Sequence, residues 1–284
     1  MNILIMKTAF LCLALCLTCG MASAQVFVEP EKTVYNADSV RAVLEDMPYF
    51  TVFKDNYLIG GTTVGETPTS KNSDVKFQLS VSQRITKSKL PFDTYLFLQY
   101  TQRAYWNVFQ NSLPIRDLNF NPGLGIGHLI VYKNKYIGRG YLMIEHESNG
   151  KDSLESRSWN KVSLGATIVL GNNVDVQAKA WYPIVDGRRN KDILDYAGLF
   201  QFGGSYRTNN DRFQLGLLFV KRKTWRMNFN SQVELSYKLN KNENHYLFLQ
   251  YYNGYGENLL EYNRFHSKIR FGFVIKPHRN FSTY

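Results

Sequence analysis

Cysteine is scarce in this chain of 284 residues, and all three cysteines lie within the first 24. The rest of the sequence therefore has no thiol that could form a disulfide, attack a substrate or bind a metal as thiolate. Long hydrophobic runs are missing as well. No apolar stretch approaches the roughly 20 residues that a membrane-spanning helix needs, so the sequence predicts no transmembrane helix.

The first 24 residues have the organisation of a signal peptide. Lys7 supplies positive charge, the apolar run over 9–17 is too short to span a bilayer, and Ala22-Ser23-Ala24 is a small-residue cleavage site. We therefore expect residues 1–24 to be removed on export. Lipid attachment at Cys19 is the alternative, but the residues before this cysteine match a lipoprotein motif poorly.

The chain has fewer acidic than basic side chains. The formal net charge is +11 at pH 7, and it falls to +10 when Lys7, the only charged side chain of the first 24 residues, is lost. A basic chain can bind nucleic acid, but exported proteins rarely meet it, so no nucleic-acid partner is expected. Anionic lipid head groups or lipopolysaccharide are the expected partners. The alternative is that the excess charge only solvates loop tips.

Aromatic residues are abundant, at 15% of the chain with 19 Tyr and 19 Phe, as in barrels whose strands carry interfacial rings. Residues 25–49 show no clear period and are expected to form an N-terminal extension, on the periplasmic side or inside a barrel. Beyond them, segments of about ten residues alternate in polarity and are separated by turn-rich stretches. The twelve segments are 55–64, 74–84, 93–106, 115–131, 137–148, 157–170, 174–185, 196–207, 212–221, 226–239, 245–253 and 264–275.

The connections between these segments alternate between short polar turns and longer loops. Gly171-Asn172-Asn173 is one of the short turns, and residues 186–195 form one of the longer loops. Short periplasmic turns and longer outer loops are typical of outer-membrane barrels, and an even strand count closes the sheet without exposed edges. We therefore expect residues 50–284 to form an all-β, twelve-stranded antiparallel transmembrane β-barrel of the outer membrane. A soluble β-sandwich would alternate similarly and is the alternative fold.

Candidate chemistry lies in the stretch 141–160. His146 and Ser148 are two residues apart, so in a β-strand both side chains lie on one face, which they share with Leu142 and Ile144. The opposite face carries the charged side chains of this strand. Polar groups on a lipid-facing surface are costly and tend to be functional, so the pair is a candidate nucleophile and base that act on lipid.

A third residue completes the candidate set. Pairing the segments 137–148 and 157–170 about the loop between them sets His146 opposite Asn160, on the same apolar face. Ser148 would attack an ester carbonyl, His146 would take and return its proton, and Asn160 would fix the imidazole tautomer. A His-x-Ser pair on a strand usually has no function by itself. The apolar face shared by all three residues is what favours catalysis.

These residues also carry a resemblance to a known family. The run His146-Glu147-Ser148-Asn149-Gly150, followed by Ser156-Arg157-Ser158-Trp159-Asn160, resembles the active-site signature of the outer membrane phospholipase A family. The resemblance covers about 48–275, nearly the whole mature chain. Flanking stretches that support it are 100–103, 111–116, 179–182 and 254–263.

The resemblance implies a twelve-stranded barrel that hydrolyses acyl esters of glycerophospholipids. Ser148 would be the nucleophile, His146 the base, and Asn160 the residue that orients it. The Gly150 amide would stabilise the oxyanion, together with calcium-bound water. The site would lie at the outer leaflet.

The resemblance further implies a calcium-dependent enzyme that is active as a homodimer, with the subunits meeting along their lipid faces. By position, calcium would be held by the Ser156 hydroxyl, the Lys151 backbone carbonyl and the partner subunit's Ser112, and oxygen ligands suit this ion. Gln102, on the outward face of its strand, would be a polar contact in the dimer seam.

This sequence departs from the family pattern near the expected metal site. Lys151 stands where an arginine is usual, Leu113 replaces a second serine, and Leu154 replaces a proline in the loop. A carbonyl ligand tolerates the first exchange, whereas the other two bear on calcium affinity.

The function expected from the sequence is that of a calcium-dependent outer-membrane phospholipase A with A1, A2 and lysophospholipase activity, activated by dimerisation and acting on membrane phospholipid. A non-enzymatic channel or structural barrel is the alternative from another class. A lipopolysaccharide deacylase would share the chemistry and differ in substrate.

Overall fold

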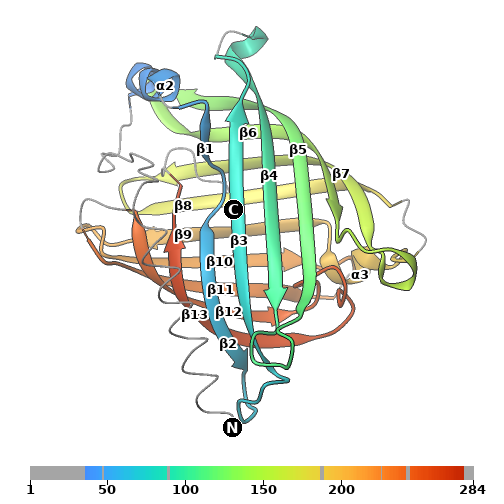
Figure 1. The fold of residues 1–284 in the computed structure, drawn as a ribbon. Coiled ribbons are helices and arrows are strands. Elements are labelled where there is room, and N and C mark those ends of the chain that lie inside the picture. Colours follow the sequence, from blue (N-terminus) through green and yellow to red (C-terminus); the bar gives the residue numbers. More distant parts are fainter. Residues whose placement is uncertain are drawn as a thin grey trace.

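The computed structural model describes residues 36–46, 48–87, 90–185, 189–224, 226–240 and 244–277. In this part of the chain, consecutive strands pair antiparallel with one another in a single sheet. The pairing of the last strand with β2 closes that sheet into a barrel (Figure 1).

The described strands agree closely with the segments expected from alternation. β1 and β2 both pair with β3, so they are two parts of one barrel strand that is interrupted at 53–55. Counted around the circumference, the barrel has twelve strands, and the predicted twelve-stranded antiparallel barrel is confirmed. The bounds are β1 (Phe50–Val52), β2 (Asn56–Thr63), β3 (Ser73–Arg84), β4 (Thr94–Trp106), β5 (Ile115–Tyr132), β6 (Lys135–Ser148), β7 (Ser158–Leu170), β8 (Val174–Ile184), β9 (Phe200–Arg207), β10 (Phe213–Lys221), β11 (Phe229–Lys238), β12 (His245–Gly254) and β13 (His266–Ile275).

Helical segments in the described residues are short. They are α2 (Ala37–Asp46), α3 (Ile193–Ala197) and the 3₁₀ turns η1 (Pro91–Asp93) and η2 (Ser153–Glu155). α2 lies in the N-terminal extension, where the sequence shows no clear period, and its Ala37 N–H donates to the Asn134 carbonyl at 3.2 Å. The predicted signal peptide lies outside the described residues. Within them, no helix has both the length and the apolar character needed to cross a membrane.

The strand β9 begins four residues later than the alternation predicts. The segment expected to start at residue 196 starts at Phe200, because α3 occupies 193–197. Gly198 ends that helix with φ +78°, a left-handed conformation that glycine adopts without steric cost, and the chain then turns into β9.

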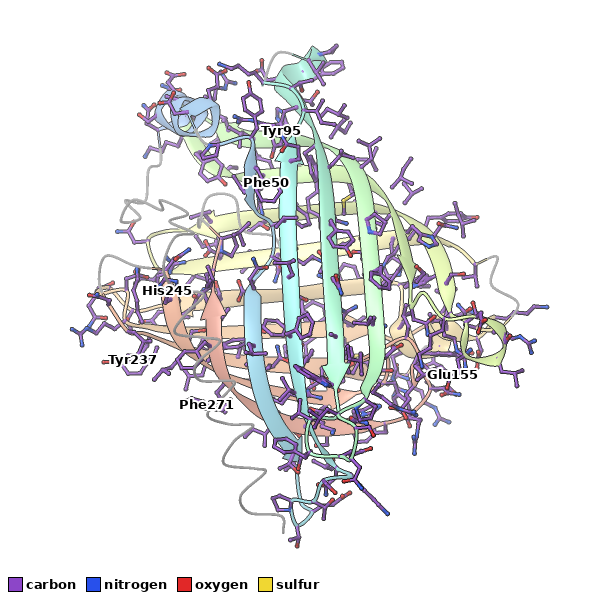
Figure 2. The ribbon with its side chains drawn as sticks, in the orientation of Figure 1. Phe50, Tyr95, Glu155, Tyr237, His245 and Phe271 are labelled. Atoms are coloured by element: carbon purple, nitrogen blue, oxygen red, sulfur yellow. The ribbon has the colours of Figure 1, made fainter. Side chains whose placement is uncertain are left out.

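The two ends of the barrel differ in their connections. One end, which we call the long-loop end, carries the loops 64–72, 107–114, 149–157, 185–199, 222–228 and 255–265. The other, the short-turn end, carries 85–93, 133–134, 171–173, 208–212 and 239–244. Glu155 lies at the long-loop end in Figure 2, whereas Tyr237 and His245 lie toward the short-turn end. This asymmetry is typical of outer-membrane barrels, whose longer loops face outward.

Side chains alternate between an apolar outer wall and a polar lumen. On β6, Leu142 and Ile144 are exposed on the outer wall, whereas Glu145 and Glu147 are buried in the lumen. β7 repeats the pattern with Leu164 outside. The predicted assignment of faces is therefore confirmed, and it is the arrangement expected of a barrel whose outer wall contacts lipid.

Buried apolar side chains pack inside the lumen near both ends. Two clusters lie toward the short-turn end, and a third, containing Trp159 and Tyr262, lies at the long-loop end. Between them, Arg270 forms ion pairs with Asp74 and Glu257, beside a cavity of about 200 Å³. A lumen filled in this way argues against an open channel.

Candidate active site

The hairpin of β6 and β7 brings the three candidate catalytic residues together. His146 lies opposite Asn160 in the register that the sequence predicts, and His146 Nδ1 is 2.8 Å from Asn160 Oδ1. Ser148 lies opposite Ser158 on β7 and Phe120 on β5. The three side chains belong to the outer wall. That of His146 is exposed, and those of Ser148 and Asn160 are half-buried.

The contact with Asn160 orients the imidazole for proton transfer. In the neutral ring, an amide oxygen that accepts a hydrogen bond from Nδ1–H leaves Nε2 as the acceptor, which is the tautomer that a general base needs. In the described part of the chain, no hydrogen bond joins this ring to the Ser148 hydroxyl. Catalytic hydrogen bonds are often long without substrate and tighten in the complex, so the arrangement is compatible with a serine–histidine pair.

A side chain on β5 holds the backbone of His146. The β5–β6 register sets Pro122 opposite His146, and proline has no N–H to donate to the strand ladder. Asn121 Nδ2 donates to the His146 carbonyl instead, at 2.8 Å. The neighbouring Asn-Pro pair thus satisfies a backbone group at the site. The sequence contains this dipeptide, but only the register shows which strand position it serves.

Glu147 lies directly behind the site, because its side chain enters the lumen while those of His146 and Ser148 point outward. Its carboxylate accepts hydrogen bonds from Lys161 Nζ at 2.9 Å, Trp159 Nε1 at 3.1 Å and Arg103 Nη2 at 2.9 Å. Two of these donors flank Asn160 in sequence. The contacts therefore tie β4, β6 and β7 together at the level of the candidate site.

Replacing Glu147 with alanine is expected to destabilise the barrel by about 3–5 kcal/mol, because Lys161 and Arg103 would lose their counter-charge inside the lumen. The heat-induced mobility shift of the refolded protein on gels measures the transition. Glu66→Ala, in an exposed loop at the same end, is the control and should leave the transition nearly unchanged. Equal transitions for both variants would contradict a stabilising role for Glu147.

The loop 149–157 is closed by one buried side chain, that of Asn149. Asn149 Oδ1 accepts the Arg157 N–H at 2.9 Å, and Nδ2 donates to the Glu155 carbonyl at 2.9 Å. The Asn149 N–H also donates to the Arg157 carbonyl at 3.1 Å. Sequence reasoning places Asn149 in the family signature but gives it no role. Here it determines the shape of the loop that follows the candidate nucleophile.

Gly150 needs to be glycine on two grounds. Its φ is +64°, in the left-handed region that glycine tolerates best. A Cβ at this position would also lie 2.9 Å from Cε2 of the Phe120 ring. The backbone two residues after Ser148 is therefore packed against an aromatic ring in a conformation that other residues strain to adopt.

The residues expected to hold calcium lie on two loops. Lys151 and Ser156 belong to 149–157, and Ser112, exposed with φ +65°, belongs to 107–114. No hydrogen bond or ion pair joins Ser112 to the other loop within the described residues. Lys151 Nζ is 2.7 Å from Glu155 Oε2, and this hydrogen bond and charge lower the pKa of the Glu155 carboxyl.

The donor chemistry at these positions bears on the expected metal. In the residues that the structure describes, no group of three or more His, Cys, Asp or Glu side chains is placed to hold a metal ion. A site here would rest instead on a hydroxyl and a backbone carbonyl, which are hard oxygen donors of the kind that calcium binds. These residues fit calcium in chemistry and leave coordination positions for water and a second subunit.

Gln102 is a polar side chain in an otherwise apolar part of the outer wall. It lies on β4 opposite the exposed Leu79 of β3 and next to Phe120 of β5. Its Oε1 accepts a hydrogen bond from the Tyr100 hydroxyl at 3.0 Å. Such a group is costly to place against lipid.

The loop 255–265 is anchored to β5 beside the candidate site. The Leu260 N–H donates to Asp117 Oδ2 at 2.9 Å, and Arg116 Nη2 is 2.8 Å from Glu261 Oε1. Burial alone would raise the pKa of Glu261, but hydrogen bonds and charges from Arg116 and Arg264 outweigh it and lower that pKa. These contacts join segments about 140 residues apart in sequence.

Comparisons with known proteins support a family assignment. The model of the phospholipase A1 family matches residues 46–275. Phospholipase A1 of Salmonella typhimurium is 29% identical over 272 residues, which cover 86% of this chain and 90% of the relative. Phospholipase A1 of Proteus vulgaris is 30% identical over 217 residues, covering 72% and 71%.

Two solved structures share the fold. Outer membrane phospholipase A from Escherichia coli aligns with a TM-score of 0.70 at 26% identity, over 80% of this chain and 98% of that one. The outer membrane phospholipase dimer from Salmonella typhi, with bound calcium, aligns with a TM-score of 0.69 at 27% identity, over 79% and 91%.

Proposed function

Because this chain belongs to the phospholipase A1 family, we propose that it hydrolyses the acyl ester bonds of glycerophospholipids from the wall of its barrel. The protein is a β-barrel of the bacterial outer membrane, as its relatives and its fold indicate. The observation that carries the proposal is the hydrogen-bonded pair of His146 and Asn160 beside Ser148, on the apolar outer wall. The outer leaflet then supplies the substrate.

In the proposed mechanism, Ser148 Oγ attacks the ester carbonyl while His146 Nε2 accepts the hydroxyl proton. Asn160 holds the Nδ1–H and so keeps the ring in the required tautomer. The bond to the leaving alcohol breaks as His146 returns the proton to the alcohol oxygen, and the acyl group remains on Ser148. Water, deprotonated by the same imidazole, then releases the fatty acid and regenerates the serine.

The negative charge that develops on the carbonyl oxygen needs a fixed donor. We assign this role to the Gly150 N–H, because the turn after Ser148 is held by the Phe120 ring and the Asn149 hydrogen bonds. A preorganised donor stabilises the transition state without reorganisation at the moment of reaction.

Calcium is the proposed cofactor, held by the Ser156 hydroxyl, the Lys151 carbonyl and the partner subunit's Ser112. Glu155 pairs with the Lys151 ammonium and reduces the positive charge that would oppose a cation. When bound, calcium would add positive charge near the developing oxyanion. The related outer membrane phospholipase from Salmonella typhi is a dimer with bound calcium, which supports both the ion and a second subunit.

Homodimerisation is the proposed active state, with Gln102 in the seam between two outer walls. Hydrogen bonds between the buried Gln102 amides of two subunits would satisfy polar groups that lipid cannot. The exposed position of His146 on the outer wall is the reason to include the A1 and A2 positions and lysophospholipids among substrates. A channel, the rival from another class, is disfavoured by the apolar clusters that occupy the lumen.

Hydrolysis of phospholipid by the refolded protein is expected to require calcium and to stop when a chelator is added. Ser156→Ala should raise the calcium concentration for half-maximal activity about tenfold, equivalent to about 1.4 kcal/mol of binding free energy. Ser153→Ala, on the same loop, is the matched control and should leave that concentration unchanged. Full activity in the presence of chelator would still support ester hydrolysis but would contradict calcium as the cofactor.

A further inference from the structure

A cluster of phenylalanine rings covers the outer wall of β9, β10 and β11 at the long-loop end. Neighbouring rings have centroids 5.5 to 6.3 Å apart. β8 separates this surface from β7, so the catalytic hairpin takes no part in it. The four residues, which we call the phenylalanine cluster, are Phe200, Phe202, Phe219 and Phe229.

The chain becomes strongly basic where the cluster ends. Residues 221–228 are Lys-Arg-Lys-Thr-Trp-Arg-Met-Asn, with four cations and no acid. Lys221 lies opposite two rings of the cluster, Phe200 and Phe229, so the cations follow the rings directly along the barrel axis. Lys223 Nζ is 3.8 Å from Asp195 Oδ1, a contact between two half-exposed side chains. The loop keeps a clear surplus of positive charge.

Internal contacts hold this loop in place. Lys221 Nζ donates to the Arg222 carbonyl at 2.7 Å and to Asn228 Oδ1 at 3.1 Å. The Arg222 guanidinium lies 4.8 Å from the Tyr255 ring centroid. Arg222 Nε is buried and has no hydrogen-bond partner among the described residues, and within them no carboxylate pairs with Arg222 or Arg226. Guanidinium groups without a carboxylate partner suit phosphate oxygens.

We propose that the phenylalanine cluster and the loop 222–228 bind the phosphorylated, multiply acylated glycolipid of the outer leaflet, lipid A. The rings lie at the depth of acyl chains, and the cations lie at the level of the head group. A soluble phosphate ligand would make no contact with the phenylalanine rings. The cations are spread along the loop, and the rings span three strands, which suits a lipid with two phosphates and several chains better than one with a single phosphate.

The test measures lipid A binding to the full-length refolded protein by native mass spectrometry from detergent. The probes are lipid A with two phosphates, the same lipid with its phosphates removed, and phosphatidylglycerol. The triple variant Arg222→Gln, Lys223→Gln, Arg226→Gln is expected to weaken binding of the diphosphorylated lipid at least tenfold. Phe202→Ala with Phe229→Ala should weaken it as well, and removing the phosphates should act like the triple variant.

A charge-matched control separates this site from general attraction. Lys71→Gln, Arg189→Gln and Lys191→Gln remove three exposed cations from other loops of the same end and should leave binding unchanged. Equal loss in both triple variants, equal binding of phosphatidylglycerol, or full competition by inorganic phosphate would each overturn the proposal. The gel mobility shift confirms that every variant is folded. Phospholipid hydrolysis plays no part in this readout, so the site and the proposed activity are tested separately.

Discussion

The Ser148→Ala protein is expected to fold as the same barrel and to lose phospholipid hydrolysis by a factor on the order of 10⁴ to 10⁶. The reason is chemical, since the acyl group has no other atom to join when the nucleophilic oxygen is gone. Ser148 is half-buried on a strand whose ladder does not depend on its hydroxyl, so the heat-induced mobility shift should stay unchanged. Fatty-acid release from phospholipid in mixed micelles with calcium measures the loss.

Ser158→Ala is the matched control for this variant. Ser158 lies directly opposite Ser148 in the β6–β7 register. Ser158 begins β7 at the long-loop end, where Ser148 ends β6. Its activity should stay within a few-fold of the parent protein. Retained turnover by the folded Ser148→Ala protein would remove Ser148 as nucleophile, and equal loss in both variants would point to a structural effect on the hairpin.

Gly150→Ala is expected to lower kcat on the order of 100-fold, with a much smaller effect on KM and on folding. An alanine here must adopt φ +64° and would bring its Cβ within 2.9 Å of the Phe120 ring, so the backbone N–H of residue 150 has to move. A donor displaced from the oxyanion loses transition-state stabilisation and leaves substrate binding largely intact. Initial rates over a range of substrate mole fractions separate kcat from KM.

Gly171→Ala tests whether this effect belongs to the site. Gly171 has φ +66°, almost the same backbone conformation, but a Cβ there would meet no atom within 4 Å. The substitution carries a similar backbone strain, at the short-turn end, and should leave kcat unchanged. A loss of kcat common to both variants would show that strain in the barrel, and not the position of one amide, governs the rate.

The fold follows from the sequence because the outer wall and the lumen impose opposite demands on alternate residues. Leu142 and Ile144 must face lipid, and Glu145 must not, so the parity of one strand determines both faces. α2 lies where no such alternation operates, and α3 overlaps the start of the predicted segment 196–207, so the sequence predicts neither helix. The break between β1 and β2 at 53–55 likewise leaves no mark in the hydrophobic pattern, so the sequence does not predict it.

Strand parity and strand register are enough to predict the core of the candidate site from the sequence. Those two arguments placed His146 opposite Asn160, and the observed pairing agrees. Asn121 supports His146 from β5, and Glu147 binds Arg103 on β4, 44 residues away in sequence. Such partners depend on which strands become neighbours and on the side chains that meet in the lumen. A pattern read along one strand holds no information about them.

The outward orientation of His146 changes how the concentration of substrate is to be counted. An enzyme with a water-filled pocket samples molecules dissolved in a volume, whereas a reactive group on the outer wall meets molecules that diffuse sideways in one leaflet. The relevant quantity is then the fraction of the surface that phospholipid occupies. Under the proposed function, a leaflet poor in phospholipid keeps even the active dimer idle, and phospholipid that enters that leaflet reaches the site directly as substrate.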